Sequence, residues 1–254
     1  MMLQHITEFD QEHQQALRGL WFLGDVHAEF RHIPEALLAA TELPSHLVFL
    51  GDLDIDHKPF REILEPLSRH FPGVQVSFIH GNHDADSFEH WTCLHDCGNA
   101  VALHGKVTEL NGIRVAGLGG NFLGRVWYPP QPPKFDSQEA ATNRGAFQFR
   151  GNQRPSPSYL AAIYPEVYDR LARLRADILV THEAPGCHPH GFEVLDSLAR
   201  DQRVKRSFHG HQHDDLTDEY RKAVAERGYD AIGVDGCAIT NGLGERVLKG
   251  VKGW

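Results

Sequence analysis

The chain has 254 residues, of which 41% are hydrophobic and 23% are charged, a composition ordinary for a soluble globular protein. This length favours a single domain over residues 1–254 with a sizeable buried core. A net charge of −9 argues against a broad electrostatic hold on nucleic acid or on an anionic membrane. We therefore expect a small substrate as partner, with nucleic acid less favoured.

No targeting or membrane-spanning pattern is found in the sequence. The first 18 residues carry Glu8, Asp10 and Glu12 and lack the apolar stretch of a signal peptide. No run reaches the roughly 18 apolar residues of a membrane helix. The four cysteines form no disulfide framework, and Cys93 and Cys97 are expected to be buried thiols rather than zinc ligands. These features predict a cytoplasmic protein with no membrane partner.

Strand and helix patterns alternate along the first hundred residues. Short apolar runs rich in β-branched and aromatic residues, each stopped by glycine and a polar side chain, predict buried strands that end in loops. Such strands are predicted at 20–23, 46–50 and 74–79. Helices are predicted between and after them, at 33–43, 58–70 and 87–97. The alternation predicts an α/β fold.

The second half of the chain continues this pattern. A hairpin turn at Asn111–Gly112 joins two of the predicted strands. Strands are predicted at 101–103, 106–110, 113–118, 177–181, 207–208 and 231–234. Helices are predicted at 164–175, 192–200 and 218–227.

Polar clusters follow many of these strands. They are Gly24–His27, Gly51–Asp54, Gly81–Asp84, Thr181–Glu183 and His209–His213. Because open α/β sheets place their ligands at the carboxyl ends of strands, we expect the Asp, Asn and His side chains to meet there. Each histidine taken alone is more often a surface or packed residue, and Asp or Asn after Gly is a common turn. The joint pattern favours a metal site.

The segment 121–158 departs from the alternation because it is rich in proline and basic residues. Its charged residues are Arg125, Lys134, Arg144, Arg150 and Arg154 against Asp136 and Glu139, a surplus of three positive charges. A connection of this length inside a compact domain is usually a functional lid or a disordered insertion. Two interpretations stay open: a solvated insertion packed by its aromatic residues, and a lid over the site in which Arg125 or Arg144 binds a phosphate.

The ordered motifs D-x-H, G-D, G-N-H-D, a later His and G-H-x-H resemble the calcineurin-like metallophosphoesterase superfamily. The matching residues run from Asp25 to His213. The resemblance implies a four-layer α/β/β/α sandwich of two mixed sheets flanked by helices. It also implies a hydrolase that cleaves phosphoester bonds with two divalent metal ions.

The resemblance further implies a ligand set in two groups that share the bridging carboxylate of Asp52. The groups are Asp25, His27 and His213 for the first ion, and Asn82, His182 and His211 for the second. A turn at Gly210 would let His211 and His213 face different ions. Mixed nitrogen and oxygen ligands suit Mn²⁺, Fe or Zn²⁺ better than Mg²⁺ or Ca²⁺, and Mn²⁺ is favoured here.

The resemblance also implies a reaction in which a hydroxide bridging the two ions attacks phosphorus in line. His83 resembles the histidine of the family that is not a ligand, and we expect it to assist the leaving oxygen. Asp84 is expected to orient His83. The neighbouring Asp54, Asp56 and His57 are expected to form turns or to support the ligands.

The sequence differs from well-known branches of the superfamily, and these differences reduce the range of expected substrates. Ala28 stands where the serine/threonine protein phosphatases and the symmetrical diadenosine tetraphosphatases have Gly, and no Arg–Gly pair follows Asp52. The sequence therefore favours a phosphodiesterase or phosphatase that acts on a nucleotide, a nucleic-acid end or another small phosphoester. Two alternatives stay open: a catalytically silent scaffold that binds a protein partner, and a nuclease subunit.

Overall fold

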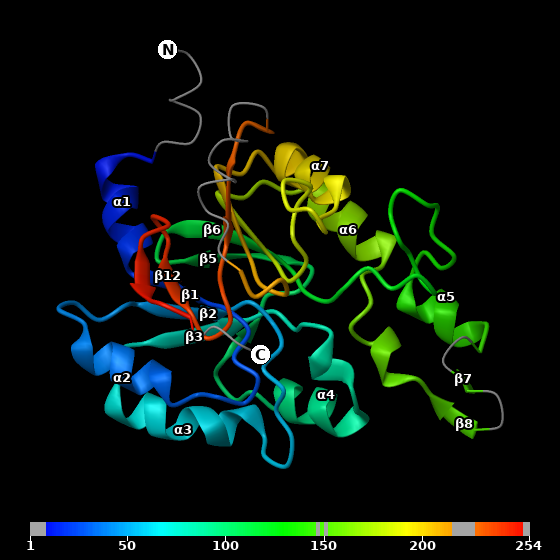
Figure 1. The fold of residues 1–254 in the computed structure, drawn as a ribbon, viewed down its shortest axis with the longest axis horizontal. Coiled ribbons are helices and arrows are strands. Elements are labelled where there is room, and N and C mark those ends of the chain that lie inside the picture. Colours follow the sequence, from blue (N-terminus) through cyan, green and yellow to red (C-terminus); the bar gives the residue numbers. More distant parts are fainter. Residues whose placement is uncertain (1–8, 146–147, 150–151, 215–226, 251–254) are drawn as a thin grey trace.

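The computed structural model describes residues 9–145, 148–149, 152–214 and 227–250, and it contains two mixed sheets (Figure 1). The first sheet has six strands, in the order β13 (Arg246–Leu248), β12 (Ile239–Asn241), β1 (Leu20–Leu23), β2 (His46–Phe49), β3 (Gln75–Phe78) and β4 (Val101–Ala102). The second has five, in the order β11 (Asp230–Gly233), β10 (Arg206–His209), β9 (Ile178–Thr181), β6 (Ile113–Leu118) and β5 (Lys106–Leu110).

Four strands of each sheet run parallel, so their carboxyl ends lie at one edge. These sets are β1 to β4 in the first sheet and β6, β9, β10 and β11 in the second. The remaining strands are antiparallel: β12 pairs with β1 and β13, and β5 forms the predicted hairpin with β6. The parallel strands therefore carry the polar clusters to a common edge, as the sequence predicted.

Alternate residues of the strands face the other sheet and the helices. In β1, Leu20 and Phe22 lie in the core between the sheets, whereas Trp21 and Leu23 face the helices. Phe22 stacks on Phe208 of β10 with ring centroids 3.9 Å apart, which joins the two sheets directly. Since both faces are covered, the parallel strands are buried almost throughout.

Helices cover both outer faces. The first sheet is covered by α2 (His32–Ala39), α3 (Phe60–His70) and α4 (Phe88–His95), and the second by α6 (Pro165–Ala172) and α7 (Glu193–Gln202) (Figure 1). The predicted four-layer sandwich is confirmed. None of the described helices is long and apolar enough to cross a membrane.

Several elements differ from the sequence predictions. The amino-terminal helix α1 (Gln11–Arg18) and the strands β12 and β13 were not predicted. The helix α2 ends at Ala39 instead of residue 43. The predicted helix at 218–227 lies outside the described residues up to its last position. Cys93 and Cys97 are free thiols, but they are only partly buried, whereas the sequence predicted that they are buried.

The segment 121–158 contains regular structure and a small core of its own. It includes α5 (Gln138–Asn143), the short strands β7 (Gln148–Phe149) and β8 (Asn152–Pro155), and a 3₁₀ turn at Pro157–Tyr159. Val126, Ala141 and Tyr159 pack together with Tyr164. This packing agrees with the interpretation of an insertion held by its aromatic residues, and the role as a lid stays a prediction.

Candidate metal centre

Loops that follow the four parallel strands β1, β2, β9 and β10 bring two groups of candidate ligand atoms together. Within each group the atoms lie within 4.8 Å of one another. The first group is Asp25, His27 and His213, and the second is Asp52, His182 and His211. The His-x-His motif therefore divides between the groups, as predicted for a turn at Gly210.

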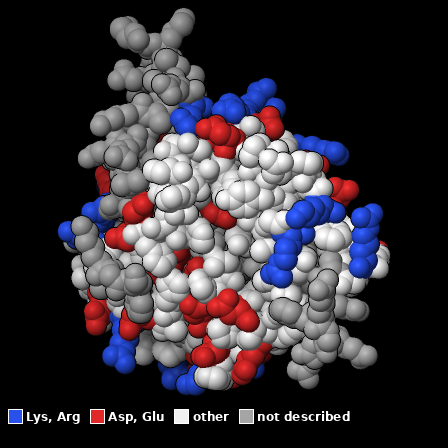
Figure 2. All heavy atoms as spheres, turned by 45° about the vertical axis from the view of Figure 1, so that its right-hand side comes forward, with Lys and Arg blue, Asp and Glu red and all other residues white. Residues whose placement is uncertain are grey.

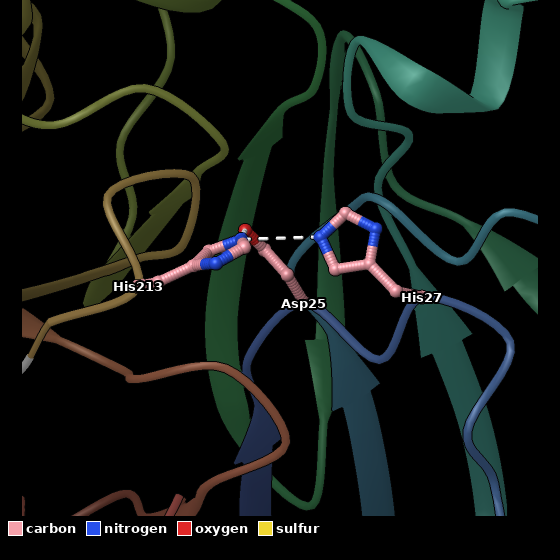
Figure 3. A group of neighbouring side chains, drawn as sticks. All are labelled: Asp25, His27 and His213. Atoms are coloured by element: carbon pink, nitrogen blue, oxygen red, sulfur yellow. Dashed lines mark hydrogen bonds and ion pairs between the residues drawn. The ribbon is translucent and has the colours of Figure 1, made fainter. Parts of the chain in front are cut away.

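The first group joins the loop after β1 to the loop after β10 (Figure 3). The Asp25 Oδ2 atom lies 3.0 Å from the His213 Nε2 atom. The Nε2 atoms of His27 and His213 face each other 3.1 Å apart. Two imidazole nitrogens and a carboxylate oxygen thus converge on one small volume, an arrangement suited to a shared cation.

The second group surrounds His182, which follows β9. Its Nε2 atom lies 3.3 Å from Asp52 Oδ2 and 3.1 Å from Asn82 Oδ1. The His211 ring lies beside it, with centroids 4.8 Å apart. The two groups adjoin, because the His182 Nδ1 atom is 3.8 Å from Asp25 Oδ1. The bridging role of Asp52 stays a prediction.

The hydrogen bonds of two histidines at Nδ1 turn their Nε2 atoms toward the other candidate ligands. The His182 Nδ1–H group donates to the Leu50 carbonyl over 2.9 Å, and the His27 Nδ1–H group donates to Asp54 Oδ2 over 2.5 Å. In both rings Nε2 is therefore the nitrogen that faces the other candidate ligands, as in metal-binding histidines. The Asp25 Oδ1 atom is buried and has no hydrogen-bond donor among the described residues. These residues fit a pair of divalent cations.

The charges of the site also favour cations. Asp25 and Asp52 are fully buried carboxylates, which are costly without positive partners. Burial lowers the pKa of His182, but the charges of Asp52 and Asp25 outweigh burial and raise this pKa to about 10. In the absence of metal, the positive charge of protonated His182 thus balances part of the negative charge that a cation would otherwise neutralise. Burial lowers the pKa of His211 to about 4, which keeps this ring neutral and able to bind metal.

Backbone geometry holds the ligands in place at a conformational cost. Four candidate ligands have positive φ angles: His27 (41°), Asp52 (46°), His211 (66°) and His213 (48°). Such left-handed conformations are unfavourable for residues other than glycine and persist where the surrounding structure imposes them. Strain concentrated on four members of one cluster points to a preorganised site.

His83 lies at the edge of this cluster. Its backbone N–H group donates to Asp52 Oδ1 over 2.8 Å, and its ring lies beside that of His27, with centroids 5.6 Å apart. Its Nδ1 atom is 2.8 Å from Asp86 Oδ2, and within the part of the chain that the structure describes no hydrogen bond to Nε2 is found. The prediction that Asp84 orients His83 is therefore wrong, since Asp86 is the carboxylate that contacts the ring.

Asp84 has a structural role. Its buried carboxylate accepts hydrogen bonds from the backbone N–H groups of Leu53, Asp54 and Gly81, over 2.8, 3.0 and 2.8 Å. The 3₁₀ turn His83–Ala85 directs Asp84 inward, whereas Asp86, three residues after His83, lies on the side of the His83 ring. Asp84 thereby ties the loop after β2 to the loop after β3.

Comparison with known proteins agrees with this geometry. The family model of the calcineurin-like phosphoesterases matches residues 19–215. The chain belongs to this family. It is 33% identical over 205 residues to an uncharacterized protein of Haemophilus influenzae, in a match that covers 77% of this chain and 84% of that protein. The chain is thus a hydrolase that acts on phosphoric esters, in a family that depends on two metal ions.

Comparison with solved structures finds similarity at low sequence identity. The phosphopantetheinyl hydrolase of Mycobacterium tuberculosis is 18% identical, with a TM-score of 0.50, over 85% of this chain and 89% of that one. A protein of Thermus thermophilus is 14% identical, with a TM-score of 0.49, over 88% of this chain and 94% of that one.

The two arginines predicted to bind substrate do not contact the ligand cluster of this phosphoesterase. Arg125 is exposed, donates to Ser158 Oγ over 3.0 Å and lies over the Tyr159 ring. Arg144 is exposed at the end of α5. Among the described residues, neither forms a hydrogen bond or ion pair with a candidate ligand. Their role toward substrate stays a prediction.

Sequence reasoning did not assign a role to Glu183, a buried carboxylate in this phosphoesterase. Its Oε1 atom accepts from the Phe122 N–H group over 3.0 Å, and its Oε2 atom lies 3.8 Å from His211 Nε2. Burial raises the pKa of Glu183 to about 7. Glu183 thus links the start of the segment 121–158 to a candidate ligand. Its position directly after His182 was the only signal in the sequence.

Acid sensitivity of the metal-free phosphoesterase is expected from His104, which burial keeps neutral with a pKa lowered to about 4. Between pH 6.5 and 4 the unfolded chain binds a proton at this residue and the folded chain does not, so stability falls as the pH falls. His104→Asn keeps an acceptor for the Gly119 N–H group. Between pH 7 and pH 5, the free energy of unfolding of His104→Asn, measured in urea, should fall by about 2 kcal/mol less than that of the wild type.

The exposed His57 provides the control for this experiment, because His57→Asn should show the pH dependence of the wild type. A His104→Asn variant with the acid sensitivity of the wild type would contradict the prediction.

Proposed function

We propose that this protein is a dinuclear, metal-dependent hydrolase of small phosphoesters such as nucleotides. The observation that carries the proposal is the convergence of two adjoining ligand groups, with the His83 backbone N–H group bonded to Asp52 and the His83 ring beside that of His27. Asp25, His27 and His213 would hold one ion, and Asn82, His182 and His211 the other, with Asp52 between them. The nitrogen-rich ligand set favours Mn²⁺, Fe or Zn²⁺ over Mg²⁺.

The surface supports a small substrate over a polynucleotide. Acidic side chains gather below the middle of the face shown in Figure 2, and Lys and Arg lie in separate places around its edges. Binding of single-stranded or duplex nucleic acid requires a positively charged groove along the backbone. The described part of this face shows no such continuous basic track.

The chain's own residues divide the remaining tasks. When bound, the two cations would generate a nucleophile from water near neutral pH and neutralise charge on the phosphoryl oxygens. The buried carboxylates and the imidazoles would fix the positions of these charges before substrate arrives. His83, with Nδ1 bonded to Asp86, would deliver a proton to the leaving oxygen.

The role of His83 predicts a dependence on the leaving group. A poor leaving group needs protonation, whereas p-nitrophenolate leaves without it. His83→Gln should therefore lower kcat on phenyl phosphate by about 10²-fold or more, within the usual range of general acid catalysis, and on p-nitrophenyl phosphate much less. His70→Gln, which changes an exposed ring on α3, is the control and should be neutral. Equal losses on both esters would contradict proton donation.

A substrate panel tests the proposed function itself. The panel consists of p-nitrophenyl phosphate, bis-p-nitrophenyl phosphate and 2′,3′-cyclic nucleotides, each with Mn²⁺ and with chelator. Turnover that requires Mn²⁺ is expected, and the ratio of diester to monoester rates distinguishes a phosphodiesterase from a phosphatase. Inertness toward every ester in the presence of Mn²⁺ would contradict the proposal and favour a scaffold.

A further inference from the structure

Asp54 lies outside the ligand groups but contacts one of them closely. Its Oδ2 atom is 2.5 Å from His27 Nδ1, on the side of the ring opposite to the ligand nitrogen. Both side chains are largely buried, with exposed fractions of 15% for His27 and 23% for Asp54. A charge-assisted hydrogen bond in such surroundings is stronger than one between neutral groups. It fixes both the ring orientation and the nitrogen that carries the proton.

The backbone of Asp54 is also held by contacts that do not involve the His27 ring. The Asp54 N–H group donates to Asp84 Oδ1 over 3.0 Å, and the residue has a φ angle of 52°. The same loop receives the His27 N–H group at the Asp52 carbonyl over 3.0 Å. The loops after β1, β2 and β3 are thus connected through Asp54 and Asp84, so the Asp54 carboxylate has a defined position from which to hold the ring.

We propose that Asp54 is a positioning residue for His27 and that it selectively sustains the ion of the first group. This inference rests on the proposed function, because it assumes that His27 binds a cation. The Asp54 carboxylate keeps the proton of His27 on Nδ1 and directs the Nε2 lone pair toward Asp25 and His213. Among the described residues, no hydrogen bond or ion pair joins the Asp54 side chain to Asp52, His182 or His211, so we expect the ion of the second group to be independent of Asp54.

Asp54→Asn is the suitable variant. Asparagine tolerates positive φ angles, so the loop is retained while the charge is removed. We expect the affinity for one Mn²⁺ ion to fall by about 10- to 100-fold, with the second ion unchanged. At a Mn²⁺ concentration between the two dissociation constants, the bound metal should fall from two ions to one per chain. Isothermal titration and elemental analysis of the full chain measure this directly.

Asp56→Asn is a matched control, since it removes the same charge two residues away from an exposed side chain that pairs with His57. This control should bind two ions with wild-type affinity. Asp54→Glu, which keeps the charge, should recover part of the lost affinity. If Asp54→Asn does not fold, the orientation of the His27 ring is measured in the wild type loaded with Zn²⁺. Its long-range ¹⁵N spectrum should show that His27 is protonated at Nδ1.

The outcomes separate this inference from the proposed function. Two ions of unchanged affinity in Asp54→Asn would overturn the positioning role and leave the proposed function intact. A wild-type chain that binds no metal would overturn both. Asp54 also lies within 4.8 Å of His83 and Asp86, so manganese located among these three side chains would make Asp54 a ligand and overturn its role as a positioning residue.

Discussion

Asp52→Asn is expected to abolish most of the phosphoesterase activity, with a loss in kcat/KM of roughly 10³-fold. The Asp52 carboxylate contacts His182 and the His83 backbone, and in the proposed function it lies between the two ions. Loss of its charge should cost several kcal/mol of transition-state stabilisation, at about 1.36 kcal/mol for each tenfold change in rate. Because asparagine tolerates the φ angle of 46° at this position, the loop should keep its shape.

Thermal unfolding with and without Mn²⁺ separates this effect from misfolding. At a free ion concentration of about 100 times the dissociation constant, each bound ion stabilises the wild type by about 2.7 kcal/mol. Asp52→Asn should lose most of this stabilisation and keep a cooperative transition without metal. Asp169→Asn, which changes an exposed carboxylate on α6, should behave as wild type. Full activity of the Asp52→Asn variant would contradict the role of Asp52 in the metal centre.

Gly81→Ala is expected to damage both stability and activity, because the loops after β2, β3 and β9 meet at this glycine. An added Cβ would lie 2.1 Å from Asp52 Oδ1 and 2.6 Å from His182 Cε1. Relief of these overlaps requires movement of two candidate ligands, since the backbone N atom of Asp52 is also only 2.5 Å away. Overpacking of this kind costs about 1–3 kcal/mol, and a displacement of about 1 Å lowers activity by about 10²-fold.

Gly73→Ala provides the matched control for this substitution. Gly73 precedes β3 at its other end, and an added Cβ there would have no neighbour within 4 Å. We expect a change in the free energy of unfolding of no more than about 0.5 kcal/mol and unchanged kinetics. Urea unfolding and steady-state rates measure both variants, and a neutral Gly81→Ala would show that the loops do not pack as the structure has them.

The sequence was sufficient for much of the sheet architecture, because the buried parallel strands have an unmistakable local pattern. Runs such as Leu20–Leu23 and Ile178–Thr181 are apolar almost throughout, since both of their faces are covered. The strands β12 and β13 were missed because they are only three residues long and pair antiparallel at the edge of the sheet, β12 with β1 and β13 with β12. Their pairing depends on a distant partner, which no local pattern reveals.

The identity of the candidate ligands was readable because loops that follow strands repeat the same residue types in a fixed order. The side chains that hydrogen-bond to the residues of the site could not be predicted from the sequence. Asp84 is the neighbour of His83 in sequence, yet Asp86 contacts the ring and Asp84 binds backbone N–H groups of another loop. The 3₁₀ turn His83–Ala85 decides this difference, because it directs Asp84 inward and leaves Asp86 on the side of the His83 ring.

The sequence by itself determined that Asp, Asn and His side chains lie at the ends of buried strands in this phosphoesterase, since local hydrophobicity and turn residues encode both. Only the tertiary structure decided how these side chains divide into two groups, and that Asp54 holds His27. The physical reason is that hydrogen bonds between loops depend on distances of a few ångströms across the sheets. Residues 27 and 213 meet only after strands far apart in the chain have aligned.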